Sequence, residues 1–408
     1  MSKYDAIVIG AGHNGLTNAA YLAKSGLKVL LLEKNDYIGG AAVSRVLHDG
    51  WTYSNCSYVC SLLRPEIFRD LNLQKYGLQV LAYGGSVTFM ENGDIFGGYS
   101  DADMFRREIS RFSKKDADAY VRFSRDVARQ CRFIKPMLLR TPPDPTSFKP
   151  KDLGELIYLF KRLYSLGEQT IYDTIRFYTM SVAEYLEEYF ETDVIKAALS
   201  GSGIIGTGLG PYSPGTAYVL LHHYMGEVDG SIGSWGYARG GMGAISNALA
   251  GAFQDHDGEI KKESEVSQII VKNGRAKGVV LANGDEYYAK NVVSNLDVKR
   301  TYQKLFDPKD LSKKILKQVD NFKIRGSSGK LNIALDGLPE FPAMGKKNPL
   351  IYADMHFIDS LERMERAFDD WKNGRWSRDP YTDVLLPTMT DPTMSPPGKH
   401  YMSVFVQY

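Results

Sequence analysis

Three glycines near the amino terminus are spaced as G-x-G-x-x-G and directly follow the apolar run 6–9. In a strand–turn–helix unit, the first glycine permits the tight turn, the second lets the backbone approach a pyrophosphate, and the third permits close helix–strand packing. The start of the helix adds backbone N–H donors and the positive end of a dipole. The pattern therefore predicts a dinucleotide cofactor site at Gly10, Ala11, Gly12, His13, Asn14 and Gly15.

A carboxylate follows where such a site needs one. Glu33 ends the apolar run 28–32, eighteen residues after Gly15, and can accept hydrogen bonds from ribose hydroxyl groups. A Gly-Gly pair a few residues later would bring the backbone close to the bound dinucleotide a second time. NAD sites do not generally need this second approach, whereas a longer ligand that extends towards a flavin does. We therefore predict FAD, with further contacts at Glu33, Lys34, Gly39, Gly40, Ala41 and Ala42.

Two buried strands and the helix between them must position these residues. Continuous apolar runs at 6–9 and 28–32 are typical of parallel strands that are buried on both faces. Residues 16–23 have the composition of a helix, which Gly26 is placed to end. A βαβ unit makes a right-handed crossover, so the carboxyl ends of both strands lie at one edge of a parallel sheet. The expected fold class is α/β, with a Rossmann-like FAD-binding domain.

The rest of the chain changes character along its length. Helical spacing with recurrent aromatic residues dominates the second hundred residues, and we expect these aromatics mainly in a core, with a roof over an apolar substrate or a membrane contact as the alternatives. Two Asn-Gly pairs, at 273–274 and 283–284, predict hairpins of a β-meander. The predicted division is an FAD-binding domain at 1–100, a mainly helical substrate or lid region at 101–225, the second part of the FAD-binding domain at 226–300, and a mixed substrate-domain segment at 301–408.

Several stretches carry a family resemblance, namely 4–15, Glu33 with 39–42, 57–58 with 61–65, 218–223, 240–243 and 293–295. Together they resemble the phytoene dehydrogenase-related FAD-dependent oxidoreductases, and most of all the branch named for a pyridine nucleotide-disulfide oxidoreductase domain. The resemblance implies a glutathione-reductase-type fold, like that of amine oxidases and phytoene desaturases, with an inserted helical and mixed substrate domain. It also implies cofactor contacts from Val266, whose backbone would meet adenine, and from Asn295.

The same resemblance implies a reaction. Members of the family transfer hydride between flavin N5 and an apolar or amphipathic organic substrate, such as a carotenoid, a retinoid or another lipid. They also carry a glycine-rich C-terminal FAD segment. This chain ends instead in the run 401–408, which is typical of a strand and has no polar tail behind it. We therefore expect the chain to be a fragment that lacks that segment.

Two other functions stay open. Cys56 and Cys60 suggest one alternative function, that of a disulfide reductase that uses FAD and NAD(P)H. On a strand, however, their Cα atoms would lie about 13 Å apart, whereas a disulfide needs less than about 7 Å. We expect buried, unreactive thiols there. A second G-x-G-x-x-G, at 201–206, follows a predicted helix, so we expect a structural loop and favour an electron acceptor other than NAD(P)H. The other alternative is a non-catalytic binding protein on the same scaffold, which the intact glycines disfavour.

The pattern assigns no catalytic side chain. Adjacent His222 and His223 are the candidates, because a histidine can exchange a proton near neutral pH while hydride moves. The alternative is one packed histidine beside an exposed one. No His/Cys cluster of the zinc type is visible, so no metal site is expected.

Composition excludes further classes of protein. The 408 residues carry 50 Lys+Arg against 48 Asp+Glu, a net charge of +2 without a basic cluster, so no nucleic-acid partner is expected. Three cysteines exclude a disulfide scaffold, and no apolar run of eighteen residues could span a bilayer. With no targeting signal at its start, the chain is expected to be cytoplasmic or peripheral to a membrane. The identity of the electron acceptor and the oligomeric state stay open.

Overall fold

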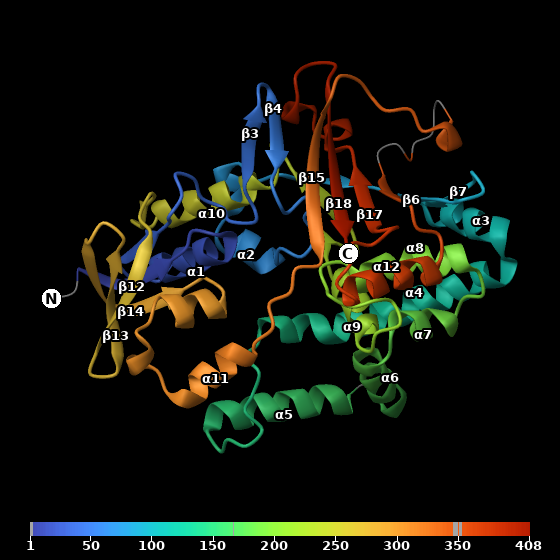
Figure 1. Cartoon of the computed structure of the whole chain (residues 1–408). Helices are drawn as coiled ribbons and strands as arrows, with labels where there is room; N and C mark the ends of the chain where they lie inside the picture. Colours follow the sequence, from blue (N-terminus) through green and yellow to red (C-terminus); the bar gives the residue numbers. More distant parts are fainter. Residues whose placement is uncertain (1–2, 166, 346–349, 351–352) are drawn as a thin grey trace.

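The computed structural model describes residues 3–165, 167–345, 350 and 353–408 (Figure 1). The dinucleotide motif belongs to a sheet of six strands, which are β1 (Tyr4–Ile9), β2 (Val29–Leu32), β11 (Glu259–Lys261), β12 (Val266–Lys272), β13 (Arg275–Leu281) and β14 (Glu286–Ser294). Their order across the sheet is β11-β2-β1-β14-β13-β12. β1 pairs in parallel with β2 and with β14, and β2 pairs in parallel with β11, while β12, β13 and β14 form the antiparallel meander.

Both faces of the central strands are covered, which explains their continuous apolar composition. α1 (His13–Lys24) and α10 (Gly243–Gln254) pack through Leu16 and Leu249 against Val8 on one face. Ile7 points to the other face and packs with Val279 of the meander. The predicted βαβ unit and the α/β fold class are therefore confirmed.

A second sheet contains β6 (Ser86–Phe89), β7 (Ile95–Gly98), β15 (Ser328–Leu335), β16 (Asp354–His356), β17 (Tyr381–Leu385) and β18 (His400–Gln407). Its order is β15-β18-β17-β16-β6-β7. One face packs on an apolar core that includes Val87, Met355 and Val384, and the other face carries polar side chains. Since β6 pairs with β16 and β7 pairs with β6 at the edge of the same sheet, the expected boundary at residue 100 does not coincide with a change of sheet. The division into domains stays a prediction.

Helices dominate the chain between residues 102 and 224, after the first two strands of this second sheet. They are α3 (Ala102–Phe112), α4 (Lys114–Ile134), α5 (Pro150–Tyr164), α6 (Glu168–Thr179), α7 (Val182–Glu187), α8 (Asp193–Ile204) and α9 (Thr216–Tyr224). Phe123, Tyr185 and Phe190 form part of their buried core, as expected. On α5, however, the expectation of a core is wrong, because Phe160 is 69% and Tyr164 is 79% exposed. Figure 1 shows why: α5 lies along the lower edge of the molecule, away from both sheets. On α6 the outcome is mixed, since Phe177 is buried in the core while Tyr172 and Tyr178 are exposed.

Shorter elements connect these layers. They are α2 (Pro65–Asp70), α11 (Lys313–Asn321), α12 (Leu361–Lys372), β3 (Ser44–His48), β4 (Trp51–Ser54), β5 (Val80–Tyr83), β8 (Glu227–Val228), β9 (Ser231–Ile232) and β10 (Trp235–Ala238). The expectation of a loop at 201–206 is wrong for the first four of these residues, because they form the last turn of α8. Among the described residues, no helix combines the length and the apolar composition that crossing a membrane requires.

Candidate cofactor site

A cavity of about 570 Å³ lies beside the carboxyl ends of β1, β2 and β14. It is lined by many of the residues that the sequence predicts to bind the cofactor, namely Gly10, Gly12, His13, Asn14, Glu33, Lys34, Gly40, Ala41, Val266 and Asn295. The other predicted residues, Ala11, Gly15, Gly39 and Ala42, do not line it. They act behind it, since the Gly39 N–H donates to the Ala11 carbonyl at 2.8 Å. The site predicted from separate segments of the chain is therefore brought together in space.

The glycines create this cavity because side chains would fill it. Gly10 has a φ of +94°, which favours glycine. A Cβ on Gly12 would lie 3.1 Å from Asn295 Nδ2, and a Cβ on Gly15 would lie 2.1 Å from the Gly10 carbonyl oxygen. Likewise, a Cβ on Gly40 would lie 3.0 Å from the Gly12 Cα. The tight turn, the open approach and the close helix–strand packing are all present.

The amino terminus of α1 is open to an anion. Gly12 caps this helix without a side-chain hydrogen bond, and the first helical N–H that bonds back to Gly12 is that of Leu16, at 2.9 Å. The His13 Nδ1 atom is buried and has no hydrogen-bond partner within the described structure, and burial lowers the pKa of its imidazole. Free N–H groups at a helix amino terminus and an unpaired buried nitrogen fit the phosphates of a dinucleotide.

Glu33 holds the edge of the cavity. Its side chain is buried, and its Oε2 accepts a hydrogen bond from the Ala11 N–H at 2.9 Å. Its Oε1 accepts from the backbone N–H of Asn35 at 3.0 Å and from the Asn35 side-chain amide at 2.9 Å. The carboxylate thus fixes the glycine loop against the end of β2 and lines the cavity in which the sequence predicts that it binds a ribose.

Other lining residues were not predicted, namely Asn35, Ser264, Glu265, Leu296, Arg300, Lys304 and Leu305. Arg300 and Lys304 add positive charge to a cavity that would hold a diphosphate. They occupy the short helical segment 300–304 that follows Asn295. Two basic residues four positions apart, directly after a strand of the cofactor sheet, are a signal that could have revealed them.

One cavity is therefore lined by Gly10 and Gly12, predicted for the diphosphate, by Glu33, predicted for the ribose, and by Val266, which the resemblance implies for adenine. The chain matches the protein family described as flavin containing amine oxidoreductase over residues 15–406. It belongs to this family. The predicted resemblance, the FAD cofactor and the assignment as an FAD-dependent oxidoreductase are confirmed.

Individual relatives agree with this family. The chain is 34% identical to pyridine nucleotide-disulfide oxidoreductase domain-containing protein 2 of Mus musculus, over 100% of the chain and 74% of that protein. It is 29% identical to the chloroplastic prolycopene isomerase of Daucus carota, over 99% of the chain and 61% of that protein. Among solved structures, an oxidoreductase from Methanosarcina mazei superposes on 99% of this chain and 79% of its own, with a TM-score of 0.62. The sequence identity is 17%, so this similarity shows the fold alone.

The two candidate histidines lie on α9, and neither lines the cofactor cavity. The Nδ1–H of His223 donates to the carbonyl oxygens of Ser202 at 2.7 Å and Val219 at 3.0 Å. Its ring stacks on Trp235 with the centroids 5.9 Å apart. These contacts describe a packed histidine, and the catalytic assignment of His222 and His223 stays a prediction.

The packing of His223 predicts a pH effect on stability. Burial lowers the pKa of its imidazole, so the folded chain binds the proton less readily than the unfolded chain, whose histidines titrate near about 6.5. The contribution of neutral His223 is thus present above that pH and lost as the pH falls below it. We expect His223→Asn to reduce the acid-induced loss of unfolding free energy in urea titrations. The exposed His48, replaced in the same way, should leave that loss unchanged, and an equal effect of both exchanges would contradict the assignment.

Proposed function

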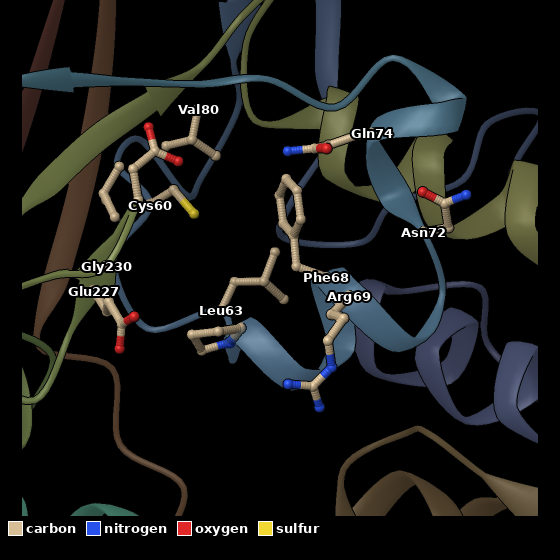
Figure 2. A pocket seen from close by; sticks show the side chains of 12 residues that line it. Cys60, Leu63, Phe68, Arg69, Asn72, Gln74, Val80, Glu227 and Gly230 are labelled. Carbon is tan, nitrogen blue, oxygen red and sulfur yellow. The ribbon is translucent and has the colours of Figure 1, made fainter.

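We propose that the chain transfers hydride between FAD and an apolar or amphipathic substrate of the carotenoid, retinoid or other lipid kind. The observation that carries this proposal is a second pocket, of about 360 Å³, which shares no lining residue with the cofactor cavity (Figure 2). Leu63, Phe68 and Val80 give it an apolar wall, and the charged side chains of Arg69 and Glu227 lie on either side of Leu63. An amphipathic molecule would place its hydrocarbon part against the apolar wall and its polar end at one of the two charged side chains.

Within this function, the redox chemistry comes from bound FAD, which accepts or gives hydride at the flavin. The chain binds and orients the cofactor through Gly10, Gly12 and Glu33. The carrot relative is named a prolycopene isomerase, and this name supports a carotenoid-like substrate.

Contact with a membrane surface is part of the same proposal, and it would bring the chain to apolar substrates. Phe148 is 90%, Phe160 is 69% and Tyr164 is 79% exposed, on and just before α5. Lys161 and Arg162 lie between the last two of these aromatics. Exposed aromatic residues interleaved with basic ones are typical of a helix that lies in the interface of a bilayer.

The disulfide reductase is supported less well. All three cysteines are free, and Cys56 is exposed, so the expectation of a buried thiol is wrong there. Cys60 is buried, as is Cys131, and burial raises the pKa of the Cys60 thiol to about 11. Since the thiolate is the reactive form, a thiol that stays protonated at neutral pH is a poor partner for disulfide exchange.

A pocket variant tests the proposal. We expect apolar polyenes to bleach the flavin absorbance of the protein anaerobically, and Leu63→Trp to slow this reaction about tenfold, because the indole would occupy space on the apolar side of the pocket. The flavin spectrum itself should not change. Stopped-flow absorbance measures both quantities.

Leu153→Trp is the matched control, because Leu153 is 40% exposed on α5 and does not line the pocket. Its bleaching rate with a water-dispersed polyene should equal that of the wild type. Bleaching by NAD(P)H followed by reduction of a disulfide substrate, without any response to polyenes, would instead establish the reductase.

A further inference from the structure

A compact group of metal-ligand side chains lies on the polar face of the second sheet, apart from the residues that line the cofactor cavity. Asp354 and His356 are two positions apart on β16, so they share a face. On β17, Asp383 pairs in register with His356 and shares that face. The ligand atoms of the three residues lie within 4.8 Å of one another, so the three side chains converge on one point.

The spacing suits an ion. The His356 Nε2 and Asp354 Oδ2 atoms are 3.3 Å apart. Four ligands held about 2.1 Å from a metal in a tetrahedron are about 3.4 Å from one another. The separations of up to 4.8 Å exceed this spacing by no more than about 1.4 Å, so small side-chain rotations would complete three corners of such a site.

The atoms that converge have no other partners. His356 is 8% and Asp383 is 3% exposed. Asp354 Oδ1, His356 Nε2 and Asp383 Oδ1 are all inaccessible to solvent and lack a hydrogen bond within the described structure, as does the hydroxyl of Thr88, the register neighbour of His356 on β6. Each carboxylate thus has one engaged oxygen, since Asp383 Oδ2 accepts from Tyr58 and Asp354 Oδ2 lies 3.3 Å from His356 Nε2, and one buried oxygen without a partner. A buried polar atom without a partner costs free energy, so a group that satisfies these atoms together would stabilise the fold.

The surrounding protein groups do not supply the missing positive charge directly. Tyr58 donates a hydrogen bond to Asp383 Oδ2 at 2.6 Å, which orients this carboxylate. The Lys330 ammonium donates instead to Ser403 and to Asn332. FAD is an anion and an apolar substrate is neutral, so neither can compensate the negative charge of two carboxylates. One divalent cation would compensate it.

We propose that Asp354, His356 and Asp383 bind a divalent first-row transition metal ion, such as Zn²⁺ or Mn²⁺. Imidazole nitrogen with carboxylate oxygen is a donor set that suits these ions. Tyr58 supports the site from outside through its hydrogen bond to a ligand, which is how outer groups tune metal affinity. The ion would join β16 to β17 and to the segment that carries Tyr58.

Metal analysis of the full chain tests this site. Protein purified without chelators and dialysed against metal-free buffer is measured by inductively coupled plasma mass spectrometry. We expect one metal ion per chain in the wild type, and at least a fivefold lower content in Asp383→Asn and in His356→Gln. The control is Asp336→Asn, whose carboxylate is exposed and paired with Lys399, and it should keep the full content.

Thermal unfolding gives a readout that does not depend on flavin or turnover. A chelator should lower the melting temperature of the wild type, and added Zn²⁺ or Mn²⁺ should restore it, while neither treatment moves that of Asp383→Asn. If that variant fails to fold, the chelator response of the wild type still decides. A wild type that carries no metal and responds to neither ion would overturn the proposal, leaving a proton shared between the two carboxyl groups as the compensation.

Discussion

Replacing Gly12 with valine should yield a folded but colourless protein. The added Cβ would lie 3.1 Å from Asn295 Nδ2 and would point into the space for the diphosphate. Valine adds two methyl groups beyond this position. We expect FAD affinity to fall about 100-fold or more, which corresponds to about 2.8 kcal/mol. The measurement is a spectrophotometric titration with FAD, alongside the flavin absorbance of the purified full chain.

The matched control is Gly329→Val. Gly329 is exposed on β15, its φ needs no glycine, and no heavy atom lies within 4 Å of a Cβ built there. A strand also accepts a β-branched residue. This variant should keep wild-type flavin content. Normal FAD binding by Gly12→Val would show that the diphosphate does not occupy the glycine cradle.

Glu33→Ala should weaken both the fold and the cofactor site. The exchange leaves the buried N–H of Ala11 and two donors of Asn35 without their acceptor. Hydrogen bonds to a charged group contribute about 1.5–3 kcal/mol each, though not additively. We expect the flavin-free protein to lose about 3 kcal/mol of unfolding free energy in urea, and its FAD affinity to fall as the loop loosens.

Two further variants separate these effects. Glu33→Gln keeps one acceptor oxygen and should lose less stability than Glu33→Ala. Glu362→Ala removes a carboxylate that is 80% exposed on α12 and should change stability by no more than about 0.5 kcal/mol. If Glu33→Ala were as mild as this surface exchange, the carboxylate would not be what holds the glycine loop.

Local sequence was enough to predict the glycine loop and Glu33, because their determinants are local, whereas Val266 and Asn295 are expected only from the family resemblance. A glycine at a positive φ, a buried apolar strand and an uncapped helix start all act within the first forty residues. The Asn-Gly turns worked for the same reason, since Asn273 and Gly274 both have positive φ angles in the β12–β13 hairpin.

Features that depend on distant pairing could not be predicted. The hydrogen bond between Tyr58 and Asp383 joins residues 325 positions apart, and no periodicity in the local sequence indicates it. Arg300 and Lys304 carry only a weak sequence signal, their spacing after β14, and the folded sheet is needed to show that they line the cofactor cavity. The aromatics of α5 have the spacing of a core helix, yet Phe160 stays 69% exposed and its ring stacks on Tyr164 of the same helix. Tertiary placement, and not periodicity, decides which side chains are covered.

The strand order has a consequence for biosynthesis. Tyr4 on β1 pairs with Ala289, and Ser86 on β6 pairs with Asp354. In each sheet, an early strand is therefore synthesised long before the strand with which it pairs. At about 5–20 residues per second, a ribosome needs roughly 15–60 s to bridge the first of these gaps. During that interval the amino-terminal strands present unpaired edges, which can associate with other chains. Production of this protein should therefore depend strongly on chaperone supply and on slow, cool expression.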